Sequence, residues 1–129
     1  MKTTLAAIAA LIPYTVHYWA ATDPGAGQYV VLWTPPHSHD EDEALIRGTA
    51  FSASLRLTAV AGTLDGVQIM LDKILGLLDT HTASVTGRHV LLTWDRSEAI
   101  DLDRTVTIPT TDRHPAFGVD TYTIHSQPI

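Results

Sequence analysis

A broad stripe of apolar residues between Val67 and Leu78 constrains the fold of this chain more than any other feature. Its members recur at helical spacing, i, i+3, i+4, i+7, i+8 and i+11: Val67, Met70, Leu71, Ile74, Leu75 and Leu78. Asp72 and Lys73 take the other side, so the pattern predicts an amphipathic helix. Asp65 is the expected N-cap, with Gln68 three residues later as a variant of the capping box. Such a helix has to bury its stripe against another element.

The segment from Gly48 to Val60 predicts that other element, a long strand. Apolar and polar residues alternate along it, with Phe51, Ala53, Leu55 and Leu57 on one face and Ser52, Ser54, Arg56 and Thr58 on the other. Side chains of a strand point alternately to its two faces, so one face is expected to join a core. The other face is expected to meet water or a partner.

The remaining segments complete an α+β pattern. We expect a helix over residues 1–12 and strands over residues 14–19, 29–33, 85–94 and 119–125, with turns at 23–27 and 109–115. Residues 29–33 are apolar throughout, which is typical of a central strand covered on both faces. Residues 97–104 favour a short turn or strand, and residues 106–108 can pair. The order predicts one α+β domain over residues 1–129, a mainly antiparallel sheet with two helices packed on one face.

The first twelve residues also resemble the start of a secretory signal peptide, with a lysine before a short apolar run. Tyr18 and Trp19 stand where a cleavage site near Ala20 and Ala21 would need small residues, and the run stops at Pro13, well short of a membrane span. We therefore expect an amphipathic helix capped by Thr3 or Thr4. Its apolar face would hold Leu5, Ile8, Ala9 and Ile12.

Composition excludes several classes of function. The chain has 129 residues and no cysteine, which rules out disulfides, thiolate zinc sites, iron–sulfur clusters and cysteine nucleophiles. Eight Lys and Arg against fourteen Asp and Glu give a formal net charge of −6. Proteins that hold nucleic acid neutralise phosphates with positive charge, so stable DNA or RNA binding is not expected.

The most reactive-looking segment is His37 to Glu43, with two imidazoles one residue apart followed by carboxylates. These groups could ligate zinc or another divalent ion. His37 and His39 follow a Pro-Pro pair in a charged run that does not fix them, and Asp40 departs from the His-x-His-x-Asp-His order of metallo-hydrolases. A solvated acidic loop is the preferred interpretation. A small metal-dependent enzyme or binding protein that uses His37 and His39 remains the alternative.

Other candidate sites are weaker. No Gly-x-Ser-x-Gly motif occurs, and Gly25 to Gly27 is followed by neither the lysine nor the helix of a phosphate-binding loop. The carboxylates of Asp95, Asp101 and Asp103 could bind Ca²⁺, but the alternation favours the wet side of a strand. The three tryptophans are expected to be core or interface anchors, namely Trp19, Trp33 and Trp94. We predict no catalytic residue, no metal ligand and no cofactor.

The order of these features resembles the tail terminator proteins of long-tailed bacteriophages, also called minor tail or tail completion proteins. The resemblance extends over nearly the whole chain. It rests on the N-terminal helix ended by Pro13, the strand at Tyr29–Leu32, the long strand at Phe51–Ala59, the Ala61-Gly62-Thr63 turn, the helix at Val67–Leu78, the strand near Val90 and the closing Val119–Tyr122. The similarity lies in this architecture.

The resemblance implies a structural virion protein without enzymatic activity. Six copies would form a ring at the head-proximal end of the tail tube, where the ring stops tube polymerisation and joins the tail to the neck. Its partners would be the tail tube protein and a neck or head-completion protein, with no membrane and with assembly in the host cytoplasm. Genome DNA would slide through the lumen without specific binding, which suits the acidic balance of the chain. Another head-to-tail joining protein is the alternative within this class.

Two surfaces are the candidate interfaces of such a ring: the acidic loop and the wet face of the long strand. The residues are Asp40, Glu41, Asp42, Glu43, Ser52, Ser54 and Arg56.

Overall fold

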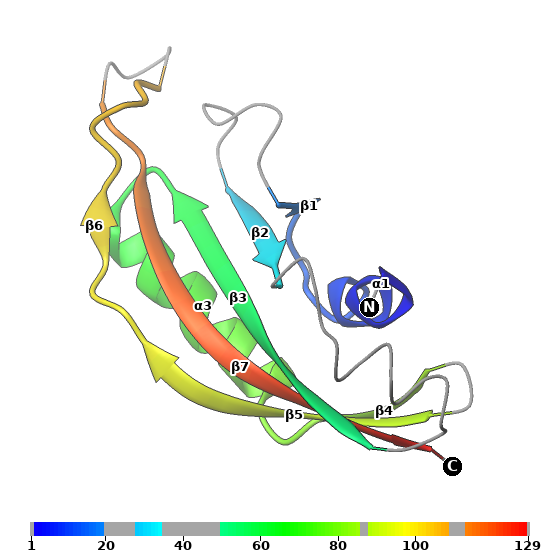
Figure 1. Ribbon diagram of the computed structural model, residues 1–129. Helices are drawn as coiled ribbons and strands as arrows, with labels where there is room; N and C mark the ends of the chain where they lie inside the picture. The colour runs from blue at the N-terminus through cyan, green and yellow to red at the C-terminus, as the bar shows by residue number, and fades with distance from the viewer. Residues whose placement is uncertain (1, 20–27, 35–49, 86–87, 109–112, 129) are drawn as a thin grey trace.

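The computed structural model describes residues 2–19, 28–34, 50–85, 88–108 and 113–128, and confirms the α+β class (Figure 1). Its elements are α1 (Lys2–Ala9), β1 (Val16–Tyr18), β2 (Tyr29–Trp33), β3 (Phe51–Ala61), α3 (Leu64–Leu78), β4 (Thr82–Val85), β5 (Arg88–Ser97), β6 (Asp101–Leu102) and β7 (Ala116–Pro128). Within the described ranges no helix is long and apolar enough to cross a bilayer.

The strands form one sheet in the order β1-β2-β3-β7-β5-β4, with β6 paired to the start of β7. β1 and β2 pair in parallel, and the other pairs are antiparallel. The longest strands, β3 and β7, pair over their whole common length from Phe51↔Ser126 to Ala61↔Ala116. The C-terminal strand is therefore the centre of the sheet, while β2 is one strand away from the edge.

Register separates the residues of the sheet into two faces. Leu57 pairs with Leu32 on one side and Asp120 on the other, and Ile124 pairs with Leu92, so these side chains share a face. A Cβ at Gly118, on the same face of β7, would lie 2.8 Å from Leu71 Cδ1 and 3.0 Å from Val67 Cγ1 of α3. This is the helix-covered face, and the glycine lets α3 lie close to the central strand.

Both helices cover this face, as the sequence predicts. Leu5, Ile8 and Ile12 at the N-terminus join the same buried cluster as the stripe of α3. Ile8 also borders a cavity of about 10 Å³ together with Val90 and Leu92 of β5. That volume is at the lower limit for a single water molecule, so this cavity holds no ligand. Figure 1 shows α3 behind the sheet, with the opposite face turned to the viewer.

The predicted N-cap of α3 is wrong by two residues. Thr63 caps the helix, because its Oγ1 accepts a hydrogen bond of 3.0 Å from the Gly66 backbone N–H. Asp65 lies inside the first turn, where its negative charge still interacts favourably with the helix dipole. The sequence pattern assigned Thr63 to a turn with Gly62, because threonine is common both in turns and at N-caps.

Three strand predictions also need correction. β4 was not predicted as a separate strand, because residues 82–85 are short and lack strong alternation. β7 runs from Ala116 to Pro128, so the expected tail after His125 continues the strand. β2 is flanked on both sides but only partly covered, since Trp33 at its end is 37% exposed.

None of the three tryptophans is a core residue, since Trp19 and Trp94 are also exposed.

Candidate functional site

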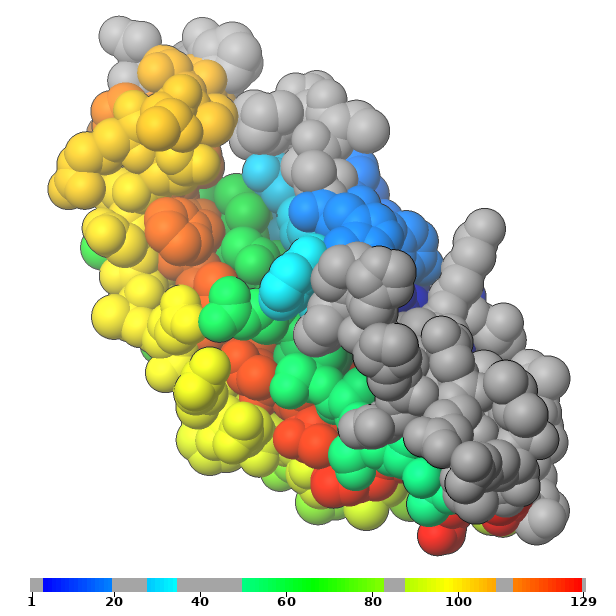
Figure 2. All heavy atoms as spheres, viewed as in Figure 1, coloured from blue at the N-terminus to red at the C-terminus, as the bar shows by residue number. Residues whose placement is uncertain are grey.

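The face of the sheet opposite the helices, here called the open face, holds the predicted interface residues of the long strand. Ser52, Ser54 and Arg56 are exposed on it. Figure 2 views the molecule from this side and shows β3 in green, β7 in orange and red, and β5 in yellow at the surface. The acidic-loop candidates, including His37, His39 and Asp40 to Glu43, lie outside the described residues.

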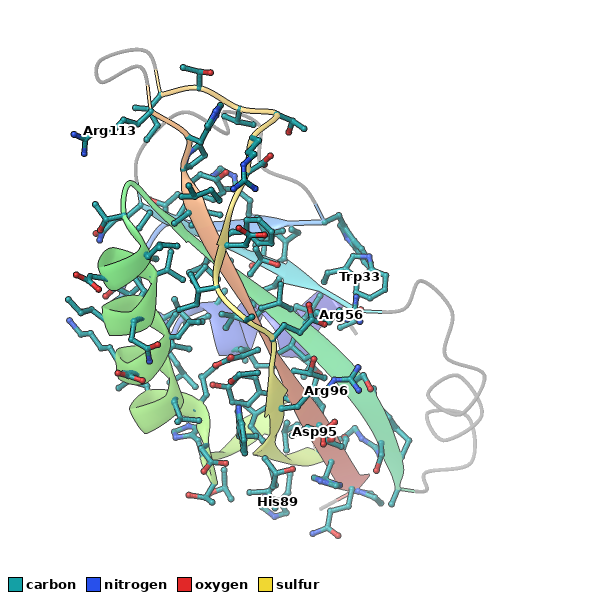
Figure 3. All side chains as sticks on the ribbon, turned by 90° about the vertical axis from the view of Figure 1, so that its left-hand side faces the viewer. Trp33, Arg56, His89, Asp95, Arg96 and Arg113 are labelled. Carbon is teal, nitrogen blue, oxygen red and sulfur yellow. The ribbon has the colours of Figure 1, made fainter. Side chains whose placement is uncertain are left out.

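A row of four residues crosses the open face from β2 to β5. Trp33 pairs with Arg56, Arg56 with Thr121, and Thr121 with Arg96. We call these four residues the cross-strand row. Figure 3 shows that Trp33, Arg56 and Arg96 all point to the side away from α3. Three neighbouring strand pairings therefore bring together side chains that are far apart in the sequence.

Aromatic and charged contacts hold the Trp33 end of the row. The guanidinium of Arg56 lies 5.6 Å from the ring centroid of Trp33, within the range of a cation–π interaction. Its Nη2 is 3.8 Å from Oε1 of Glu98. Trp19 meets Trp33 edge to face at a centroid distance of 6.3 Å, and both indoles stay exposed.

The backbone at Trp19 has a φ of 71°, a left-handed conformation that bulky residues rarely adopt. Conformations of this kind cost about 1–3 kcal/mol and persist where the surrounding structure enforces them. Here the strained residue presents an exposed indole beside Trp33. The fold thus holds two large aromatic groups at the surface at an energetic cost.

The middle of the row carries a buried hydroxyl. Thr121 is 4% exposed although it belongs to the open face, because it lies between Arg56 and Arg96 in register. Its Oγ1 has no hydrogen-bond partner among the described residues. The exposed arginines on either side of Thr121 each offer several N–H donors, so this part of the row suits a carboxylate or another anionic acceptor.

Below the row, His125 connects three strands. Its Nδ1 is 3.3 Å from Oγ of Ser52 on β3, and its Nε2 is 3.1 Å from Oγ1 of Thr93 on β5. A catalytic serine–histidine pair needs a carboxylate at the second ring nitrogen, and here a threonine hydroxyl occupies that place. The arrangement is a hydrogen-bonded ladder across the sheet.

In the part of the chain that the structure describes, the scattered histidines and carboxylates do not converge. Among the described residues, no group of three or more His, Asp or Glu side chains could hold a metal ion. Asp103 accepts hydrogen bonds from the backbone and hydroxyl of Thr105, and these bonds lower the pKa of its carboxyl. Asp101 binds its own neighbour, the Leu102 N–H, at 2.7 Å. Asp101 lies in β6 and is exposed, as the alternation predicts, whereas Asp103 lies after the strand, in a turn with Thr105.

Asp120 is the one acidic residue of β7 and lies on the helix-covered face, 3% exposed. Burial raises the pKa of its carboxyl, while a hydrogen bond from Ser97 acts in the opposite direction. Its Oδ1 has no partner among the described residues, and the hydroxyl of Tyr122 on the same face has none either. Burial also raises the pKa of Tyr122. The two groups lie beneath α3, away from any surface site.

The outward face of α3 was not predicted to matter, yet it is a second exposed surface. Ile69 is 65% exposed and stands among Asp65, Asp72 and Gly76 on the side away from the core. A Cβ at Gly76 would meet nothing within 4 Å, so packing inside this chain does not require a glycine there. The sequence carried a signal for this surface, because Ile69 is a large apolar residue that lies outside the buried stripe of the helix.

A comparison of the chain with protein-family models and with curated proteins finds no match.

Proposed function

We propose that this protein is a structural subunit of a phage virion, a tail terminator that forms a six-membered ring at the head-proximal end of the tail tube. The ring ends tube polymerisation and joins the tail to the neck. The observation that carries the proposal is the division of the sheet: both helices cover one face, and among the described residues the other face carries exposed side chains on β2, β3, β7 and β5. A subunit held between neighbours needs such an uncovered surface.

The character of the open face supports an assembly role over an enzymatic one. Its exposed tryptophan and arginine residues belong to the types that dominate protein–protein interfaces. The hydrogen-bonded ladder at His125 lacks the carboxylate of a catalytic triad. The formal charge of −6 suits a ring through which DNA slides without being held.

The function is tested with phage particles assembled without this protein. We expect electron micrographs to show tails of uncontrolled length or heads without tails, because nothing would stop the tube or connect it to the neck. Particles with joined tails of normal length would contradict the proposal. A complementing copy with His37→Ala and His39→Ala should restore normal particles, whereas a metal-dependent function would be lost.

Native mass spectrometry of the purified protein tests the ring directly. We expect a metal-free species at six times the subunit mass of 14.0 kDa. A monomer with one stoichiometric zinc would instead favour the metal-binding alternative at His37 and His39.

A further inference from the structure

The described part of the chain has seven exposed large hydrophobic side chains, and most of them gather on two surfaces. Trp19 and Trp33 lie against each other at the β1–β2 side of the open face, and Arg56 lies over Trp33. Ile69 and Leu77 lie on the side of α3 away from the core, where Asp65 and Asp72 flank Ile69 and Lys73 is one turn from each of the two apolar residues. One surface combines aromatic rings with cations and the other combines aliphatic groups with carboxylates, so their chemistry is complementary.

The spacing of the two surfaces also matches. Along α3, the outward stripe runs Ile69, Asp72 and Gly76, with rises from Ile69 of about 4.5 and 10.5 Å at 1.5 Å per residue. Along the cross-strand row, Arg56, Thr121 and Arg96 follow Trp33 at about 5, 10 and 14 Å, the spacing of adjacent strands. A helix that lies across the strands would therefore place Ile69, Asp72 and Gly76 over Trp33, Arg56 and Thr121, in that order.

We propose that the outward stripe of α3 in one copy of this chain docks on the cross-strand row of a second copy. Ile69 packs on Trp33, and the Asp72 carboxylate binds the guanidinium of Arg56. Gly76 allows the helix backbone to approach the sheet over Thr121.

The two surfaces lie on opposite sides of the subunit, so the contact is head to tail: one copy keeps its row unused and the other keeps its α3 stripe unused. A contact of this type closes into a ring or continues as a filament, depending on the rotation between copies. The inference rests on the proposed ring function, since it names the surfaces that would join neighbouring ring subunits.

Charge reversal tests the contact in the purified full-length protein. Arg56→Glu and Asp72→Arg should each weaken self-association by about tenfold or more, since each places like charges together. The two changes combined in one chain should restore association. Asp101→Arg and Arg104→Glu reverse an exposed ion pair elsewhere on the surface and serve as matched controls. Equal loss in the controls, or no recovery in the combined variant, would overturn the contact.

Cross-linking tests the head-to-tail geometry, and the absence of cysteine gives it a clean background. Lys73→Cys beside the stripe and Ser54→Cys beside the row are both exposed changes, and circular dichroism checks that each variant folds. A mixture of the two variants should form disulfide-linked pairs between unlike copies. Pairs within the Ser54→Cys variant alone, at equal yield, would mean that open faces meet each other and would sink the proposal.

A wild-type chain that stays monomeric at its highest attainable concentration and gives no cross-link would also overturn the contact. That result would leave the terminator function standing, because a tail tube could assemble the ring through other surfaces. Conversely, tails of normal length in particles without the protein would contradict the function even if the contact forms. The two failures are therefore distinguishable.

Discussion

Asp120 is a single residue that lowers the stability of the folded protein at neutral pH. Its carboxyl is buried beneath α3, and one of its oxygens has no partner among the described residues. Burial of a charge without full compensation lowers stability, and the pKa of the group rises in response. The residue is retained at the centre of the sheet despite this cost.

We expect Asp120→Asn to raise the free energy of unfolding at neutral pH by about 1 kcal/mol, since the amide removes a poorly compensated charge. The native state binds the Asp120 proton more tightly than the unfolded state does. This contribution to wild-type stability is therefore complete below the ordinary pKa of 3.8 and is lost as the pH rises through the raised native pKa. Urea unfolding at several pH values should show the two proteins converging in acid. A difference that does not change with pH would contradict this.

Thr80, just after α3, holds a φ of 58°, which is unfavourable for a β-branched residue. Thr80→Gly should raise the free energy of unfolding by about 1 kcal/mol, because glycine adopts this conformation without strain. The hydrogen bond from the Thr80 N–H to the Leu92 carbonyl, 2.8 Å long, is kept. Thr82→Gly in β4 is the matched control and should lower stability. Equal destabilisation by both changes in thermal melts would show that Thr80 is not strained.

At the scale of elements, the relation between α3 and the central strand decides the fold. The stripe of α3 predicts a helix that needs a covered surface, and Gly118 of β7 supplies the space for close approach. The sequence predicts both elements but not their pairing. Helix and strand periodicities are local properties, whereas the position of β7 between β3 and β5 depends on contacts between distant segments.

A glycine at position 76 lowers the stability of α3 in the monomer, whereas the proposed contact uses it for close approach to a second copy. Gly76→Ala should raise the free energy of unfolding of the monomer by about 1 kcal/mol, because alanine has the higher helix propensity and its Cβ meets no atom within 4 Å. At Gly66 the same change should gain less or destabilise, since a Cβ there would lie 3.0 Å from Thr63 Oγ1 and 3.2 Å from Ala61 Cβ. Chemical denaturation of both variants measures the contrast. An equal effect at the two sites would refute it.

At the scale of the whole molecule, the division into a covered face and an open face links fold to function. If copies associate only when folded, mass action stabilises the native state as concentration rises. The melting temperature of the wild-type protein should therefore increase with protein concentration. Arg56→Glu should show a flat dependence, with the Arg104→Glu control behaving like wild type. Scanning calorimetry over a dilution series measures this, and a flat wild-type curve would contradict association through folded subunits.

The sequence by itself determined the class of fold, the two helices and most strands, because periodicity, breakers and composition act locally. It also identified the exposed face of Ser52, Ser54 and Arg56, since alternation along one strand fixes which side chains lie together. Only the tertiary structure decided that Asp120 is covered and that Trp33, Arg56, Thr121 and Arg96 form one row. A row across four strands depends on strand order and register, and these are set by the packing of distant segments, since Trp33 and Thr121 are 88 positions apart in the sequence.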